Sequence, residues 1–384
     1  MSAKKIAILA LGFRPFYLLA SLWAVFGILE WLLELQGVGL RRFNALPGIQ
    51  WHSHEMIFGF AATVVTGFAL TAVRAWTGLD TPTGLKLFLL VTLWITARIG
   101  AFTGNIFILA DICFLPVIAI VIGRLIFKAR MYRNFFLPLI LIVLGGLNAC
   151  FYLSVLGYVN LDANALIFDS LYLIIMIQIM IGNRIIPSFT ANAIPGLKQN
   201  RSQTLTKAAV MGSAFTFLLQ MFAPSGPMNA VACFAMAVIH IILTWGWRPL
   251  ATKDKPMLWI LHISYSWIVL GFLMLGLFQL RVISIYPALH VFGIGATGGL
   301  IISMITRTAL GHTGRPVVAG LSETTCYLGI QATFLLWLLA NARHDAWFYP
   351  LMVIAGCCWM SVFMIYIIKY FPLLAQPRSD GKAG

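Results

Sequence analysis

Two histidines and a carboxylate lie close together in the segment WHSHEM at residues 51–56. His52 and His54 have the H-x-H spacing that is common among metal ligands, because a neutral imidazole suits copper, zinc and haem iron. Glu55 is a natural hydrogen-bond acceptor for one ring N–H, and Trp51 precedes the pair. Residues two apart point to different sides of a continuous helix, but they can converge in an extended or N-cap segment. We interpret the pair as ligands rather than as polar residues of a membrane interface.

A second pair of histidines marks the two ends of the apolar stretch from Leu289 to Arg315. In one helix, the 22 residues that separate His290 from His312 span about 33 Å, roughly the thickness of the hydrocarbon core of a bilayer. No single metal can bind both side chains. Four glycines between them, at 293, 295, 298 and 299, allow another helix or a flat cofactor to approach the backbone closely.

Two further histidines, His240 and His262, are predicted to lie near the same side of the membrane as His312. We therefore expect two groups at different depths: an inner group of His240, His262 and His312, and an outer group of His52, His54 and His290. A histidine in a membrane helix can also be a simple interhelical hydrogen-bonding group, and His344 fits an exposed loop. From the residues alone, haem with two axial imidazoles, copper and zinc all remain open.

Several arginines could bind an anion beside these histidines. Arg184 lies in a polar helix end that a proline interrupts, which is expected where a helix lines a cavity or binds an anion. Arg307 and Arg315 follow the glycine-rich stretch, and Arg14 stands at the start of the first apolar segment. An arginine can bind a carboxylate such as a haem propionate with two hydrogen bonds, but each of these could also be an interfacial anchor.

Two acids, Asp111 and Asp169, lie within apolar segments. Acids within a membrane are rare and mark a functional interior or a proton path. Neither has an obvious basic partner in the sequence, so we give this pair less weight than the histidines.

The elements that position these residues are membrane helices. The chain has 384 residues, of which 61% are hydrophobic and 10% charged, and its mean hydropathy is +0.93. Apolar segments of spanning length recur from end to end, which indicates an all-α, polytopic integral membrane protein. The excess of Lys and Arg falls between these segments, so it sets orientation in the bilayer and does not indicate nucleic-acid binding. The six cysteines include no C-x-x-C pair, which argues against disulfides and covalently attached haem.

We predict about twelve spans, all within a single transmembrane helical domain that covers residues 1–384. Their predicted bounds are 11–35, 52–74, 84–102, 105–127, 134–156, 164–187, 204–223, 227–247, 256–279, 284–307, 320–340 and 346–370. Most basic residues, beginning with Lys4 and Lys5, then fall on one side of the membrane. Only Arg41, Arg42, Arg98, Arg281 and Arg343 fall on the other side. The positive-inside rule therefore predicts that the N- and C-termini are both cytoplasmic.

The chain resembles the NnrS family, bacterial membrane proteins that contain haem and copper and are associated with nitric oxide. The resemblance rests on GFRPFYLL, WHSHEM with the following FGFAATVVTGF, GNRIIPSFTAN, PMLWILHISYSW, and LH…GHTGRP at 289–316. It implies non-covalent b-type haem and copper as cofactors, with nitric oxide or a derived small molecule as a partner. It also implies relief of nitrosative stress as the role and the bacterial inner membrane as the location. The implied ligands are His52, His54, His262, His290 and His312, while His240 lies outside the shared motifs.

Two other functions remain open at this level. Twelve spans with intramembrane acids are also typical of a transporter of a metal or small molecule. A quinol-linked electron-transfer protein is the other alternative. Within the leading interpretation, the H-x-H pair makes the outer group the better copper candidate and the inner group the better haem candidate. The outer group could equally hold a haem, and the sequence does not decide whether the protein has catalytic turnover.

Overall fold

The computed structural model describes residues 7–40, 46–103, 106–223, 226–343 and 345–381. Within these ranges the chain forms helices and no strand, which confirms the predicted all-α class. The residues at positions 4, 5, 41, 42 and 344, for which orientation or exposure was predicted, lie outside the described residues.

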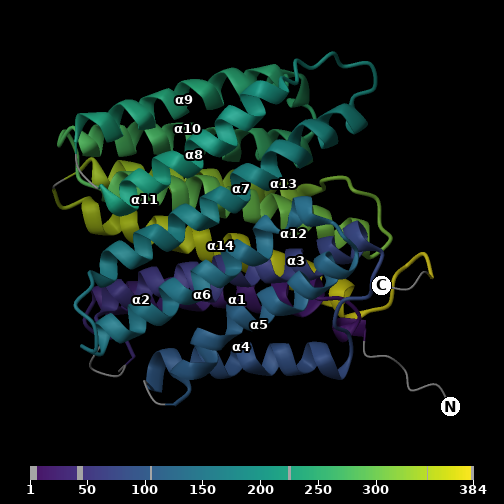
Figure 1. Cartoon of the computed structure of the whole chain (residues 1–384), viewed down its shortest axis with the longest axis horizontal. Coiled ribbons are helices and arrows are strands. Elements are labelled where there is room, and N and C mark those ends of the chain that lie inside the picture. The colour runs from purple at the N-terminus through teal and green to yellow at the C-terminus, as the bar shows by residue number, and fades with distance from the viewer. Residues whose placement is uncertain (1–6, 41–45, 104–105, 224–225, 344, 382–384) are drawn as a thin grey trace. The chain divides into compact units, whose positions relative to one another are not determined.

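The helices follow one another along the chain with short connections (Figure 1). They are α1 (Phe13–Leu35), α2 (Gly48–His54), η2 (Glu55–Ala61), α3 (Ala62–Thr77), α4 (Leu85–Thr103), α5 (Ile108–Lys128), α6 (Phe136–Val155), α7 (Ala163–Ala193), α8 (Gln203–Phe222), α9 (Pro227–Gly246), η4 (Pro249–Thr252), α10 (Pro256–Gln279), α11 (Tyr286–His290), η5 (Val291–Gly298), α12 (Gly299–His312), α13 (Leu321–Asn341) and α14 (Phe348–Ala375).

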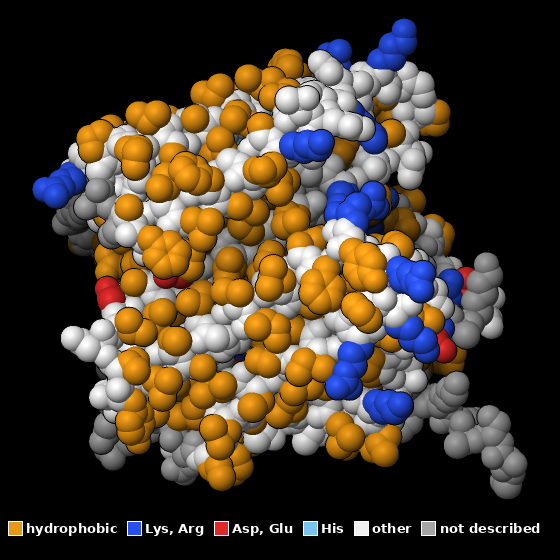
Figure 2. All heavy atoms as spheres, in the orientation of Figure 1, with side chains coloured by type: hydrophobic (Ala, Val, Ile, Leu, Met, Phe, Trp, Pro, Cys, Tyr) orange, Lys and Arg blue, Asp and Glu red, His pale blue; other side chains and the backbone are white. Residues whose placement is uncertain are grey.

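Each predicted span coincides with a long helix or a run of adjoining helices. Among the described residues, 11 of these are long and apolar enough to cross a membrane, so the chain is a multi-pass membrane protein. Hydrophobic side chains cover most of the visible helix surfaces, as lipid contact requires (Figure 2). The remaining helix, α13, has the right length, but its Ser, Thr, Glu and Gln side chains reduce its hydropathy, and it is not one of the 11. The count of twelve therefore stays a prediction.

The chain divides into two compact units. Unit 1 contains residues 1–170, 305–317 and 363–384, and unit 2 contains residues 171–304 and 318–362. Three of the four boundaries fall inside α7, α12 and α14, and the fourth, between residues 317 and 318, lies in the connection before α13. The expectation of a single transmembrane domain stays a prediction, because each unit is described by itself.

Close helix packing in unit 1 depends on small residues. A Cβ atom at Gly67 of α3 would lie 3.1 Å from Phe16 and Tyr17 of α1, and one at Gly145 of α6 would lie 2.6 Å from the ring of Pro116 in α5. Neither neighbour could yield without moving its helix. Lipid gives helices no hydrophobic reason to associate, so such close backbone approach supplies much of the attraction between them.

The two ends of the described chain meet at one end of unit 1. The Arg14 Nη1 atom at the start of α1 donates hydrogen bonds to the carbonyl oxygens of Leu374 and Gln376, both 2.7 Å away, at the end of α14. The Arg378 guanidinium, just beyond α14, donates to the carbonyl of His312 at 2.9 Å. The start of α1, the end of α12 and the end of α14 therefore share one side of the unit.

Two π-helical segments interrupt the α-helical path, and each begins directly after a histidine. Segment η2 follows His54 in unit 1, and η5 follows His290 in unit 2. A π-helical turn contains an extra residue, so it turns the helix beyond it relative to the helix before it, and such turns are frequent at functional sites. Both contain glycine, which allows the wider turn to pack closely against a neighbouring helix.

Unit 2 is organised around α10, which packs antiparallel against η5 and the start of α12. Three glycine contacts fix the register: Gly271 faces Phe292, Gly295 faces Trp267, and Gly299 faces Ser264. A layer of aromatic rings supports this pair from α7 and α8, where Phe217 stacks on Tyr172 at 4.9 Å and on Phe272 at 5.3 Å.

We predict that α13 crosses the membrane as the twelfth span. A chain whose first and last helices have their termini at the same side must cross an even number of times, and α13 is the remaining helix of spanning length among the described residues. Reporter fusions truncated after Val318 and after Arg343 should therefore report opposite sides of the membrane. Identical readings at these two positions would show that α13 does not cross.

Candidate functional site

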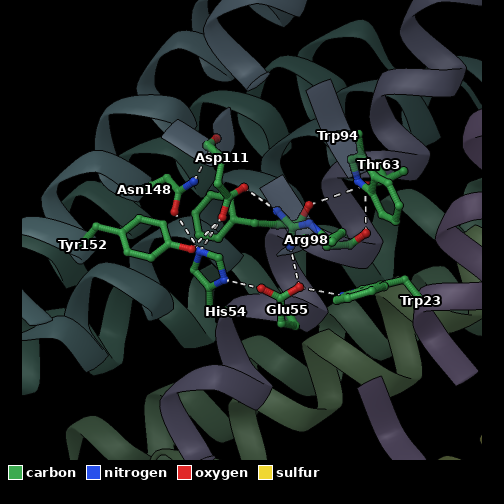
Figure 3. A network of polar contacts seen from close by, with 11 residues as sticks. Trp23, His54, Glu55, Thr63, Trp94, Arg98, Asp111, Asn148 and Tyr152 are labelled. Atoms are coloured by element: carbon green, nitrogen blue, oxygen red, sulfur yellow. Dashed lines mark hydrogen bonds and ion pairs between the residues drawn. The ribbon is translucent and has the colours of Figure 1, made fainter. Parts of the chain in front are cut away.

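A buried polar network in unit 1 contains the second histidine of the H-x-H pair (Figure 3). His54 ends α2 and Glu55 begins η2, while Arg98 comes from α4 and Asp111 from α5. Two residues of α6, Asn148 and Tyr152, complete the network, and all six side chains are buried. Three long helices thus contribute polar side chains to one point beside the α2–η2 junction.

Arg98 joins the two carboxylates of the network. Its guanidinium forms ion pairs with Glu55 through Nη1 and with Asp111 through Nη2. The indole rings of Trp23 and Trp94 lie 5.8 and 5.7 Å from its central carbon, close enough for cation–π attraction. The charges of Arg98, Glu55 and Asp111 stabilise one another, because an isolated ion in a medium of low dielectric constant is strongly destabilised.

Both carboxylates have further hydrogen-bond donors. The Trp23 Nε1–H donates to Glu55 Oε2 at 2.6 Å, and the Tyr152 hydroxyl donates to Asp111 Oδ2 at 2.8 Å. Charge-assisted hydrogen bonds of this kind favour the ionised carboxylate. The structure therefore supplies the partner that the sequence did not reveal for Asp111.

Both ring nitrogens of His54 are engaged in the network. Its Nδ1 lies 2.8 Å from Glu55 Oε1, and its Nε2 lies 2.8 Å from Asn148 Oδ1. The Asn148 amide is oriented by its Nδ2, which donates to the backbone carbonyl of Asp111 at 3.3 Å. Both ring nitrogens thus face hydrogen-bond acceptors.

This arrangement does not suit metal binding by His54. Ligand atoms of His54, Glu55 and Asp111 lie within 4.8 Å of one another, and within the described part of the chain they are the one cluster of this kind. However, Arg98 already supplies the positive charge between the carboxylates. A metal would also need a lone pair on His54, and neither ring nitrogen offers one here.

The first histidine of the pair points elsewhere. His52 stacks on Trp31 of α1, with ring centroids 4.8 Å apart, whereas His54 stacks on Phe151 of α6 at 4.9 Å. The segment is helical, so side chains two residues apart face different neighbours. The two rings do not converge on one point. Trp51 packs into the aromatic core of unit 1 against Phe102 at 5.3 Å.

The remaining histidine of unit 1, His312, lies at the end where the termini meet. Its ring is 5.6 Å from that of Phe13, and the charges of Arg74 and Arg378 act on it. Arg14, Arg315 and Arg378 also act on one another through their charges. Arg307 is half-buried one turn before this end of α12. The ring nitrogens of His312 have no hydrogen-bond partner among the described residues.

Among the described residues, unit 2 contains three further histidines. His240 of α9 uses both ring nitrogens: Nε2 lies 3.0 Å from Ser213 Oγ, and Nδ1 lies 3.1 Å from the hydroxyl of Tyr265. The Asn183 Nδ2 atom donates to that hydroxyl at 3.1 Å, which leaves the tyrosine proton to be donated to His240. His240 is therefore an interhelical hydrogen-bonding group, the alternative role that the sequence left open.

The tautomer and ring orientation of His290 are those of a metal ligand. Its Nδ1–H donates to the backbone carbonyl of Tyr286 at 3.0 Å, which leaves the lone pair on Nε2. The ring stacks on Trp337 of α13 with centroids 3.9 Å apart and an angle of 11°. Metal-binding histidines commonly have this arrangement, because the hydrogen bond fixes the tautomer and the stacking fixes the ring. Nε2 has no partner among the described residues.

His262 uses one ring nitrogen. Its Nε2 lies 2.9 Å from Thr190 Oγ1, and the Thr190 hydroxyl donates to the carbonyl of Ile186 at 2.9 Å. The threonine oxygen is therefore an acceptor, so the proton of His262 is on Nε2 and the lone pair is on Nδ1. That Nδ1 atom is buried and has no hydrogen-bond partner among the described residues.

The register of unit 2 separates His262 from His290. The three glycine contacts place His290 level with position 273 of α10, about 11 residues or about 16 Å from His262. One ion cannot bind both side chains.

Both predicted histidine groups combine residues of the two units. The outer group combines His52 and His54 of unit 1 with His290 of unit 2, and the inner group combines His312 of unit 1 with His240 and His262 of unit 2. Because each unit is described by itself, both groups stay predictions, as does the pairing of Arg184 in unit 2 with Arg315 in unit 1.

The sequence pattern of the NnrS protein family matches residues 7–378. The chain belongs to the NnrS family. This match confirms the resemblance that the motifs indicated, and NnrS membership identifies the chain as a membrane protein related to nitric oxide. No curated protein sequence matches the chain.

Sequence reasoning missed Arg98, Asn148 and Tyr152, which hold the NnrS motif WHSHEM in place. Arg98 was counted among the basic residues of the outer side, but it is buried within α4, 13 residues before its partner Asp111. The signal was present, because opposite charges in consecutive apolar segments pair when no water is available. Asn148 and Tyr152 gave no such signal, since amides and phenols are common in membrane helices.

Replacing Arg98 with glutamine should strongly destabilise unit 1, because Glu55 and Asp111 would remain buried without a counter-charge. Removal of one partner from a buried ion pair lowers the free energy of unfolding by about 3–5 kcal/mol. The measurement is the unfolding temperature of the purified protein. The matched control is Arg343→Gln, which breaks an exposed pair in which the hydrogen bond from Arg343 lowers the pKa of Asp345. Equal effects of the two substitutions would contradict the role of Arg98.

Proposed function

We propose that this NnrS protein binds haem and copper in the bacterial inner membrane and acts in nitric oxide metabolism or in resistance to nitrosative stress. Family membership supports the link to nitric oxide. The proposal that the chain binds a metal cofactor is supported by the orientation of His290. Its Nδ1–H donates to the carbonyl of Tyr286, and its Nε2 lone pair has no partner among the described residues.

The donor sets favour different cofactors. Copper binds imidazole readily and, unlike haem, carries no propionates that need basic residues nearby. His290, stacked on Trp337, therefore suits copper as a ligand. Haem carries two propionates and needs basic residues near its ligand; Arg14 and Arg315 supply such charge at this end of unit 1, whereas Arg378 is already ion-paired with Asp380. A bound haem would supply an iron that can bind nitric oxide.

The residues of the chain have defined tasks in this proposal. His312 would orient the haem, and the arginine charges would attract its propionates, although the Arg14 Nη1 atom is already held by two carbonyl groups. The buried indole of Trp337, stacked on His290, would fix the ring and cover one of its faces. His54 and His240 do not fit as ligands, because both of their ring nitrogens are hydrogen-bonded.

The substitutions His290→Ala and His312→Ala should each remove one cofactor and spare the other. We expect copper per chain to fall about tenfold or more in the first variant, and haem per chain to fall by a similar factor in the second. Metal analysis and the absorption spectrum of the purified protein measure these contents.

The matched control is His240→Asn, which changes a buried histidine of unit 2 that has no free ring nitrogen. This variant should retain both cofactors. Loss of the same single cofactor from both the His290 and the His312 variants would refute two separate sites. A wild-type protein without haem and copper would refute the proposal as a whole.

A further inference from the structure

Unit 2 contains a cavity of about 760 Å³ between α9, η4, α10 and α13. Its walls are apolar and aromatic, with the indole rings of Trp245, Trp259 and Trp267 among them. Lys253 and Leu328 of α13 also line it, and Leu328 is exposed at its open side. This volume is in the range of pockets for drug-sized molecules and exceeds what a metal ion requires.

One polar side chain in the wall has an unused atom. His262 lines the cavity and is only 5% exposed, and its Nδ1 has no hydrogen-bond partner among the described residues. Thr190 holds the ring with Nε2 protonated, so Nδ1 is a buried acceptor. Burying an acceptor without a donor is destabilising, and a ligand with an O–H group would supply the missing hydrogen bond.

The chemistry of the cavity narrows the class of ligand. Lys253 in the wall attracts anions, but the lone pair at His262 repels carboxylate and phosphate oxygens from its own position. It also disfavours a quinone carbonyl, which can only accept hydrogen bonds. Indole walls favour a flat ring, since aromatic pairs gain attraction beyond burial of their area. Several wall residues, including Trp245 and Leu328, are largely exposed on helix faces suited to lipid, so an apolar tail can leave the cavity there.

We infer that this cavity binds a lipid-soluble hydroquinone, whose phenolic O–H donates to His262 Nδ1 while its ring lies against the tryptophans. The inference gives His262 a ligand-binding role in place of the metal-ligand role predicted from the sequence. It does not depend on haem or copper, because binding requires only the side chains of unit 2.

Equilibrium binding to the full-length protein in detergent tests the inference with three probes: decylubiquinol, decylubiquinone and the dimethyl ether of decylubiquinol. The hydroquinone should bind about fivefold or more tightly than the other two, because only it can donate a hydrogen bond. His262→Phe should remove this preference. Equal affinity for all three probes would overturn the assignment to His262.

A second variant avoids any folding defect caused by changing a buried histidine. Leu328 is 59% exposed, so Leu328→Trp can fill the cavity from its open side without disturbing the core. It should abolish hydroquinone binding, whereas Trp347→Ala, at a residue that is 60% exposed and outside the cavity wall, should have no effect. Unchanged binding in Leu328→Trp would overturn the site. Displacement of the probe by phosphatidylglycerol instead would assign the cavity to a lipid.

Discussion

The helix packing of unit 1 depends above all on the two ion pairs that the guanidinium of Arg98 forms with the carboxylates of Glu55 and Asp111. In a bilayer core no water can compensate a charge, so each of these groups is tolerable only because the others are present. The pairing joins η2, α4 and α5, and through Tyr152 it reaches α6. Apolar packing alone would let these helices rotate or slide against one another, since lipid is as apolar as their side chains. The charges therefore define one arrangement of the helices, and they hold the ring of His54 in place.

Hydrogen bonds decide what each histidine can do, and chemically identical rings have different roles as a result. A ring with both nitrogens engaged, as in His54 and His240, serves the fold. A ring with one nitrogen held and one lone pair open, as in His262 and His290, can serve a ligand. The partners that make this distinction are mostly uncharged: a threonine, a serine, a tyrosine or a backbone carbonyl. The role open to each histidine of this chain thus rests on polar residues that are inconspicuous in the sequence.

The sequence was sufficient for the helices, because a run of apolar residues long enough to cross a bilayer has few other stable structures. It was ambiguous at α13, where Ser and Thr side chains reduce hydropathy without preventing a helix. It could not predict the π-helical segments after His54 and His290, since no residue pattern distinguishes the wider turn. The candidate site was half predictable: WHSHEM marked its position, but its meaning depended on Arg98 and Asn148, which lie 43 and 94 residues further along the chain. Proximity across such distances comes from tertiary packing.

The contact between Arg14 and the end of α14 has a consequence for biosynthesis. The two partners are 360 residues apart, and unit 1 as a whole is built from the beginning, the middle and the end of the chain. At about 5–20 residues per second, the ribosome needs roughly 20 to 70 s to make the segment that separates them. Throughout that time the first helix is present while the carbonyl groups that satisfy its arginine do not yet exist. Completion of unit 1 is therefore a post-translational event, and an early stop codon would leave a membrane-inserted fragment with an exposed charge that quality-control proteases can recognise.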